Sequence, residues 1–114
     1  DVARHAGCRA VFTERVDGTM MLRRGFDISE GERILIAEDV TTTGGSVKEV
    51  MEAVNKFGGD IKAVTAVVDR SGGRVDFGVD YFSLFEMDVE TYDPETCPLC
   101  KEGSKPVKPG SRGN

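Results

Sequence analysis

The chain has 114 residues and a formal net charge of −5, which is enough for one domain with its own core. The acidic balance argues against a nucleic-acid surface, which needs a basic patch, and no apolar run reaches the length of a membrane span. We find no signal-peptide pattern, and the odd count of three cysteines does not suit a secreted disulfide framework. The sequence therefore predicts a soluble, cytoplasmic domain that binds neither nucleic acid nor membrane.

The first residues are typical of the end of a helix. Residues 1–7 finish at Gly7, a common helix C-cap, and no helix start precedes them. We therefore expect the N-terminal portion of a longer protein, and part of its active site, to be missing here. The fragment alone is expected to lack activity.

A hairpin is predicted next. Residues 9–13 are β-branched or aromatic and predict a strand, and Asp17-Gly18 is a hairpin signal. Residues 20–26 would form the second arm. A turn at residues 29–32 then leads into a short buried strand at residues 33–37.

A helix is predicted over residues 46–57, where apolar residues recur at helical spacing. Ser46 and Glu49 have the spacing of a capping box, which puts the helix N-terminus beside the glycine pair at 44–45. A second glycine pair, at 58–59, ends the helix.

The following segments predict a parallel sheet. Residues 61–68 are almost continuously apolar or β-branched, as in a strand covered on both faces, and residues 81–85 form a further strand. An irregular tail follows from residue 93. Strand, helix and strand with short links favour a βαβ unit, and so an α/β fold. In such sheets ligands bind at the carboxyl ends of the strands, here at residues 38–46 and 69–73.

The loop after the strand at residues 33–37 is the first candidate site. Its two acids can hold sugar hydroxyls or a metal, and its hydroxyls, glycines and helix N-terminus can hold a phosphate. The alternative is a solvated strand end. No Walker A pattern is present, so a phosphate monoester is favoured over a nucleoside triphosphate. The candidate residues are Glu38, Asp39, Val40, Thr41, Thr42, Thr43, Gly44, Gly45 and Ser46.

Residues 34–46, with the sequence ILIAEDVTTTGGS, resemble the signature of type I phosphoribosyltransferases, which bind phosphoribosyl diphosphate. Residues 67–72, 97–103 and 107–112 further resemble the bacterial orotate-specific members. The resemblance covers nearly the whole chain. It implies a Rossmann-like parallel sheet of the type I phosphoribosyltransferase fold, with the N-terminal hood missing.

The resemblance also implies a division of the chain and a partner. Residues 1–92 would be the phosphoribosyltransferase core, with a mobile loop at about residues 14–25. Residues 93–114 would be an irregular C-terminal tail. The complete protein is expected to be a homodimer, because loops in this family reach into the neighbouring subunit.

The implied activity is transfer of a phosphoribosyl group from phosphoribosyl diphosphate to orotate in pyrimidine biosynthesis, with Mg²⁺ as cofactor. Residues 38–46 would hold the phosphoribosyl group, and Thr42 and Arg70 would contact orotate. An Arg can bind the orotate carboxylate through two parallel hydrogen bonds. The alternative for Arg70 is a surface ion pair with Asp69 or Glu38.

The implied catalytic residues are Asp39, a candidate general base beside the ribose, and Arg15, which would contact the leaving diphosphate. Arg15 is preferred over Arg23 and Arg24. Many family members carry a lysine cluster and a histidine in this loop, and this sequence has neither. The alternative is that these arginines form a charged hairpin edge that discourages aggregation.

Other functions stay open. A purine-specific phosphoribosyltransferase is one alternative, although Arg70 argues against it because purines have no carboxylate. A non-catalytic module that senses phosphoribosyl diphosphate is another.

We assign no residue as a metal ligand. Cys97 and Cys100 have the spacing of half a zinc site, but a tight turn with two thiols is favoured over a zinc shared between subunits.

Overall fold

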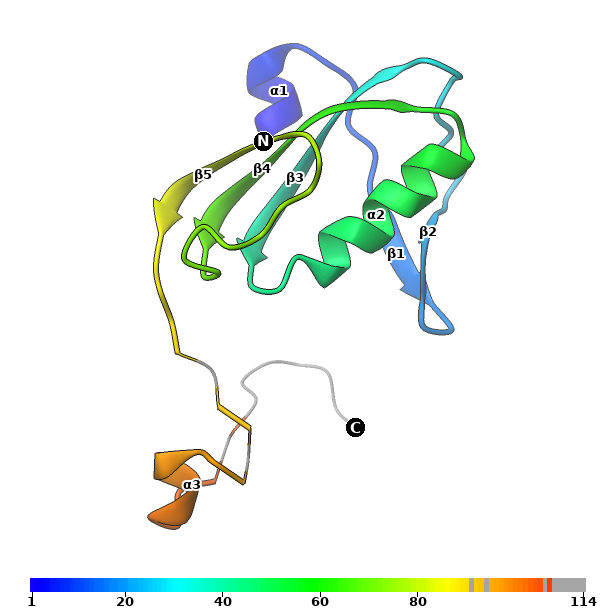
Figure 1. The fold of residues 1–114 in the computed structure, drawn as a ribbon. Coiled ribbons are helices and arrows are strands. Elements are labelled where there is room, and N and C mark those ends of the chain that lie inside the picture. Colours follow the sequence, from blue (N-terminus) through cyan, green and yellow to red (C-terminus); the bar gives the residue numbers. More distant parts are fainter. Residues whose placement is uncertain (91, 94, 106, 108–114) are drawn as a thin grey trace.

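The centre of the fold is a three-stranded parallel sheet in the order β3-β4-β5 (Figure 1). The computed structural model describes residues 1–90, 92–93, 95–105 and 107. The strands are β3 (Arg33–Thr41), β4 (Asp60–Asp69) and β5 (Asp80–Glu86), and helix α2 (Gly45–Lys56) joins β3 to β4. The predicted βαβ unit and parallel sheet are therefore confirmed.

A hairpin precedes the sheet. Strands β1 (Thr13–Val16) and β2 (Thr19–Leu22) pair antiparallel, and β2 contacts α2. The two turn residues both have positive φ, 48° at Asp17 and 82° at Gly18, as a type I′ turn requires. The predicted turn is confirmed, but the second arm stops at β2 because the chain turns at Arg24 and Gly25, which also have positive φ.

The predicted strand at residues 9–13 is wrong except for its last residue. Residues 9–12 pair with no strand in the described part of the chain, and side chains hold them instead. Arg9 donates to the carbonyl of Asp27 at 2.9 Å and to Glu32 Oε2 at 2.7 Å. Phe12 packs edge-on against Phe26, with ring centroids 5.0 Å apart.

Strand β3 is longer than predicted. It continues past Ala37 because pairing with β4 continues, with Glu38 opposite Ala66 and Thr41 opposite Asp69. The two acids therefore lie on the last part of the strand and not in the loop that follows it.

Helix α2 begins at a glycine cap and not at a capping box. Gly44 is the N-cap with φ 75°, and no side chain caps the helix. A Cβ at Gly44 would lie 2.8 Å from Val75 Cγ1 and 2.9 Å from Phe77 Cε1, so only glycine fits this turn. The capping-box prediction is wrong because Ser46 already lies inside the helix and Glu49 pairs with Arg15.

The core lies between α2 and one face of the sheet. It is built on four buried side chains, Ile36, Val47, Val64 and Phe77. Tyr81 packs edge-on against Phe77, with ring centroids 5.0 Å apart. The apolar spacing that predicted the helix therefore marks the stripe that packs on the strands.

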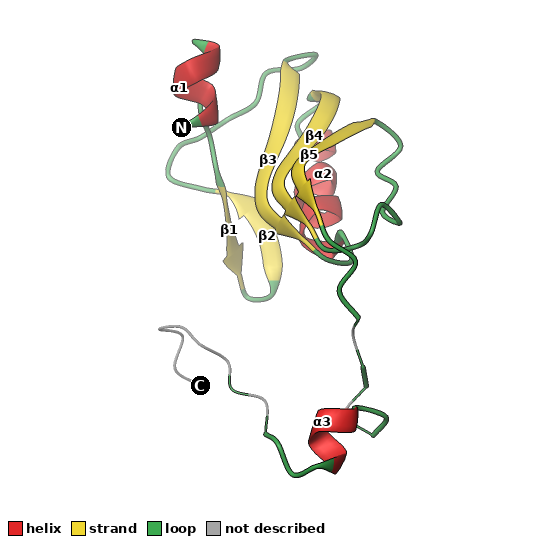
Figure 2. Ribbon diagram, turned by 90° about the vertical axis from the view of Figure 1, so that its left-hand side faces the viewer, coloured by secondary structure: helices red, strands yellow, loops and turns green. Residues whose placement is uncertain are grey.

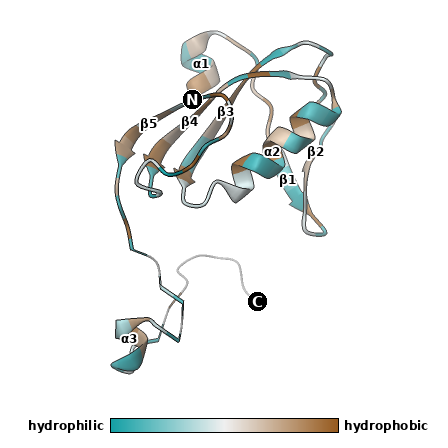
Figure 3. Cartoon of the chain, in the orientation of Figure 1, coloured by the Kyte–Doolittle hydropathy of each residue, from teal (hydrophilic) through white to brown (hydrophobic). Residues whose placement is uncertain are grey.

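The opposite face of the sheet is open in the described chain, so the prediction that the strand at residues 61–68 is covered on both faces is wrong here. Leu35 and Val67 are 49% and 48% exposed, and Phe82 and Leu84 are 61% and 75% exposed. Strand alternation puts all four on the face away from α2. In Figure 3, where hydrophobic residues are brown, all three strands carry hydrophobic stretches.

Two short helices complete the described chain. Helix α1 (Val2–Ala6) ends at Gly7 with φ 65°, as predicted, and has no buried residues. It lies on the side of the sheet away from α2 (Figure 2). The tail contains helix α3 (Pro98–Lys101), and most of the motif at 107–112 lies outside the described residues. No helix among the described residues could cross a membrane.

Candidate active site

The carboxyl ends of β3 and β4 bring the two predicted loops together. Thr41 is the last residue of β3, and its carbonyl accepts a hydrogen bond from Arg70 N at 2.8 Å. The segment after β4 therefore begins directly beside the loop that joins β3 to α2. This is the arrangement expected at the strand ends of a parallel sheet.

The loop into α2 surrounds a hollow of about 50 Å³, lined by Glu38 and residues 40–47. Lys48 N bonds to the carbonyl of Gly44 at 3.0 Å, which starts the helix. The N–H groups ahead of Lys48 have no acceptor within the helix and remain free for an anion. The hydroxyl of Thr41 is buried and has no hydrogen-bond partner in the described chain. The hollow is thus lined with hydrogen-bond donors that have no acceptor in the described chain.

The pKa values of the two acids at the end of β3 are shifted in opposite directions. Burial, followed by the hydrogen bond and charge of Asp39, raises the pKa of Glu38. The hydrogen bond from Glu38 and the backbone N–H of Val40 lower the pKa of Asp39. Asp39 is exposed, and its Oδ1 accepts the Val40 N–H at 2.7 Å. The pair therefore holds a proton on Glu38 more readily than on Asp39.

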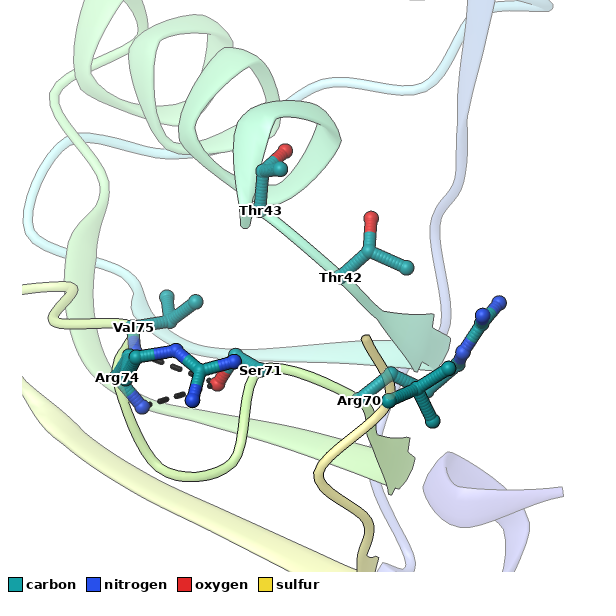
Figure 4. Close-up of a pocket in the computed structure, with 7 residues that line it drawn as sticks. Thr42, Thr43, Arg70, Ser71, Arg74 and Val75 are labelled. Atoms are coloured by element: carbon teal, nitrogen blue, oxygen red, sulfur yellow. Dashed lines mark hydrogen bonds between the residues drawn. The ribbon is translucent and has the colours of Figure 1, made fainter. Parts of the chain in front are cut away.

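A larger cavity of about 310 Å³ lies beside the hollow, and the close-up in Figure 4 shows the side chains around it. It is lined by Thr42, Thr43, Arg70, Ser71, Arg74, Val75 and Val89. Thr42 and Thr43 also line the hollow, so the two spaces are adjacent.

The two arginine side chains of this cavity differ in whether they form an ion pair. Ser71 Oγ accepts the backbone N–H groups of Arg74 at 3.1 Å and Val75 at 3.3 Å, which shapes the turn. The Arg74 side chain is paired with Asp88 at 3.0 Å. Arg70 is exposed and forms no ion pair within the described residues, so the expected alternative of a surface pair is not seen.

A third, open cavity of about 790 Å³ separates the hairpin from the strand end. Its lining includes Arg15, Arg23, Glu38 and Ser46. Arg15 donates to the carbonyl of Gly18 at 2.6 Å, and its Nη2 lies 2.6 Å from Glu49 Oε2. The fold thus brings Arg15 to the same open space as Glu38.

Arg24 has a different setting. It pairs with Glu14 at 2.6 Å, and its guanidinium lies 5.6 Å from the centre of the Phe12 ring. These contacts attach Arg24 to the hairpin itself, and the preference for Arg15 stays a prediction.

The sequence analysis gave no individual role in the site to three residues of this region, Glu49, Ser71 and Arg74, although Ser71 lies in the predicted strand-end loop at residues 69–73. Glu49 was read as a capping residue, and its contact with Arg15 depends on how the hairpin docks on α2. Ser71 and Arg74 follow a strand end that was recognised, but nothing in their spacing distinguishes them from ordinary turn residues.

Among the described residues no cluster of three or more possible metal ligands is found. Glu38 and Asp39 offer two adjacent carboxylates at the end of β3. Mg²⁺ keeps several waters and is often bound through one or two carboxylates together with substrate phosphates.

The fold and the strand-end loop are those of phosphoribosyl transferase domains. Residues 9–95 match the family described as the phosphoribosyl transferase domain, and the chain belongs to that family. Two similar relatives are orotate phosphoribosyltransferases. That of Caldanaerobacter subterraneus subsp. tengcongensis is 58% identical over 98% of this chain and 59% of its own length. That of Thermotoga maritima is 54% identical over 98% of this chain and 60% of its own length.

Solved structures support the fold. Adenine phosphoribosyltransferase from Leishmania tarentolae aligns with a TM-score of 0.61 at 17% identity, over 79% of this chain and 56% of that one. The enzyme from Thermoanaerobacter pseudethanolicus aligns with a TM-score of 0.58 at 18% identity, over 75% and 60%. At such identities the likeness concerns the fold alone. The chain spans about three fifths of the length of the curated relatives it matches.

Proposed function

We propose that this chain carries the phosphoribosyl diphosphate site of an orotate phosphoribosyltransferase, which forms orotidine monophosphate and diphosphate in pyrimidine biosynthesis. One observation carries the proposal. A hollow with unused hydrogen-bond donors shares Thr42 and Thr43 with a cavity that holds Arg70, a guanidinium without an ion-pair partner in the described chain. The orotate phosphoribosyltransferases that are 54–58% identical to this chain support it.

The hollow at residues 40–47 suits the phosphate of the sugar. The free N–H groups at the start of α2 point partial positive charge at it, and the hydroxyls of Thr42, Thr43 and Ser46 add donors. Glu38 and Asp39 lie at the adjoining strand end, where carboxylates can accept hydrogen bonds from ribose hydroxyls.

The cavity of about 310 Å³ suits orotate. Arg70 would bind its carboxylate, and the Thr42 hydroxyl would contact the ring. Arg74 is held by Asp88 and would contribute shape more than charge. A purine offers no carboxylate for Arg70.

In the proposed reaction, the bond from the ribose carbon to the diphosphate oxygen breaks and a bond to the orotate ring nitrogen forms. That nitrogen loses its proton, for which Asp39 is the candidate acceptor. Positive charge develops on the ribose as diphosphate departs, so the acids stabilise the transition state and Arg15 the leaving group. Mg²⁺ would neutralise charge on the diphosphate.

The proposal extends to the whole protein, as a cytoplasmic homodimer with a mobile loop near residues 14–25. The docked hairpin supports the loop assignment, because it carries Arg15 to the open cavity beside Glu38. The dimer and the compartment rest on the family resemblance and on the composition.

The proposal is tested with the whole purified protein by measuring diphosphate release from phosphoribosyl diphosphate and Mg²⁺. The acceptors are orotate, adenine and hypoxanthine, and one reaction has none. We expect release with orotate only, together with orotidine monophosphate. Turnover with a purine but not orotate would replace the proposal with a purine-specific transferase. Tight binding of phosphoribosyl diphosphate without any turnover would replace it with a sensor.

A further inference from the structure

The tail holds two thiols in one helical turn, and neither is among the residues that line the cavities of the candidate active site. Cys97 is the residue before α3, and Cys100 is the third residue of the helix. Lys101 N donates to the Cys97 carbonyl at 3.2 Å, which closes the turn around both. Both cysteines are free and partly exposed.

Their spacing suits a disulfide. Residues three apart in a helical turn have Cβ atoms about 5–6 Å apart, while a disulfide needs about 3.5–4.5 Å. Cys97 has extended backbone angles, with ψ 119°, so it lies before the helix and the Cβ spacing of a helix interior does not apply to it.

The two thiols also differ in reactivity. Hydrogen bonding to the backbone and the thiol of Cys100 lowers the pKa of Cys97. The hydrogen bond to Cys97 raises the pKa of Cys100. Cys97 is thus the thiol that more readily becomes a thiolate, the attacking form.

A metal site is the less suitable interpretation. A zinc site built from cysteines needs four ligands, and no cluster of three or more possible ligands is found among the described residues. Two thiols alone suffice for dithiol chemistry.

We propose that Cys97 and Cys100 form a redox-active dithiol that exchanges with a small-molecule disulfide of the glutathione type. The Cys97 thiolate attacks one sulfur of that disulfide, breaks its S–S bond and releases one small thiol. The Cys100 sulfur then attacks the mixed disulfide at Cys97, loses its proton and releases the second thiol. Two protein thiols are oxidised and one small disulfide is reduced.

The test treats the whole protein with oxidised glutathione and follows the tail peptide by mass spectrometry. We expect the loss of two hydrogen atoms from the peptide that contains both cysteines, reversed by a reducing agent. Cys100→Ser should stop at glutathione bound to Cys97, and Cys97→Ser should prevent closure. Cys8→Ser is the matched control, because Cys8 is an exposed single thiol. It should leave closure unchanged.

Three outcomes would overturn the proposal. The first is a wild-type protein that keeps glutathione on Cys97 without closing the disulfide. The second is a Cys97 that reacts no faster than Cys8. The third is Zn²⁺ bound at one ion per two chains that protects both tail thiols from alkylation, which would assign them to a shared metal site.

Discussion

The ion pair between Arg15 and Glu49 joins the hairpin to α2, the helix that starts at the hollow lined by Glu38 and residues 40–47. Its two side chains are about two fifths exposed, so it should add little to stability. Its value lies in holding the guanidinium toward the open cavity beside Glu38. We therefore interpret Glu49 as a positioning residue.

Replacing Glu49 with Gln in the whole protein should lower kcat about tenfold while KM for orotate changes little, because only the leaving-group contact is misplaced. Arg15→Gln should cost more, about a hundredfold. Glu52→Gln, on an exposed position of the same helix, is the matched control. Steady-state kinetics with an unchanged melting temperature distinguish positioning from unfolding. Equal rates for Glu49→Gln and wild type would contradict the role.

The acid pair predicts a pH dependence of substrate binding. The pKa of Glu38 is raised mainly by burial, so this group ionises above the usual glutamate range. If its carboxylate accepts ribose hydroxyls, the affinity for phosphoribosyl diphosphate with Mg²⁺ should rise as the pH increases through that pKa. Calorimetric titrations of wild type and Glu38→Gln across this range check the sign. An identical rise in both proteins would remove Glu38 from the explanation.

At the scale of residues, the sequence predicted which side chains lie together where those residues are close neighbours along the chain. The acids and the hydroxyl-rich loop could be placed beside one another because they follow each other along one strand–loop–helix unit, whereas the role of Arg70, which follows β4, was implied by the family resemblance and stays a prediction. Glu49 was misassigned because a capping pattern and an ion pair across elements use the same residue type. Only the docked hairpin, which depends on long-range packing, decides between them.

At the scale of elements, the junction between β3 and α2 depends on its two glycines in different ways. Gly44 has φ 75°, and a Cβ there would press on Val75 and Phe77. Gly45 lies in the helix, where an added Cβ would come no closer than 3.6 Å, to Thr43 Oγ1.

Gly44→Ala should destabilise the protein by about 2 kcal/mol, because it adds a left-handed penalty and a steric clash. Gly45→Ala should instead be neutral or stabilise by up to about 1 kcal/mol through helix propensity. Urea unfolding of both variants measures the difference. Similar free energies of unfolding would show that the cap conformation is not required.

Element types were predictable because apolar periodicity marks strands and helices locally, but boundaries were not. Residues 9–12 have strand-like composition, yet Arg9 anchors them by side-chain bonds and they find no strand partner in the described chain. Conversely, β3 continues through two acids because β4 continues beside it. Strand ends depend on the partner, which composition does not specify.

At the scale of the molecule, the sheet has one packed face and one open face. The near-continuous apolar residues of β4 predicted cover on both faces, and the described elements supply only α2. Phe82 and Leu84 form the most exposed part of the open face. Contiguous apolar surface of this kind promotes association.

The 114-residue chain by itself should therefore bind a hydrophobic dye such as ANS and self-associate. Phe82→Ser with Leu84→Ser should reduce both effects several-fold. Val107→Ser is a suitable control, because Val107 is 84% exposed but lies in the tail. Dye fluorescence and light scattering provide the measurements. Unchanged dye binding in the double variant would show that this face is not the responsible surface.

The most direct test of the central claim is the separate affinity of each substrate for the whole protein with Arg70→Gln. Losing a charge-assisted contact of about 1.5–3 kcal/mol should weaken orotate binding about ten- to a hundredfold. The affinity for phosphoribosyl diphosphate should stay within about twofold, because its proposed site lies at residues 38–46. Arg74→Gln, already held by Asp88, should affect orotate much less. Orotate binding that is unaffected by Arg70→Gln would contradict the assignment of this cavity to the orotate carboxylate.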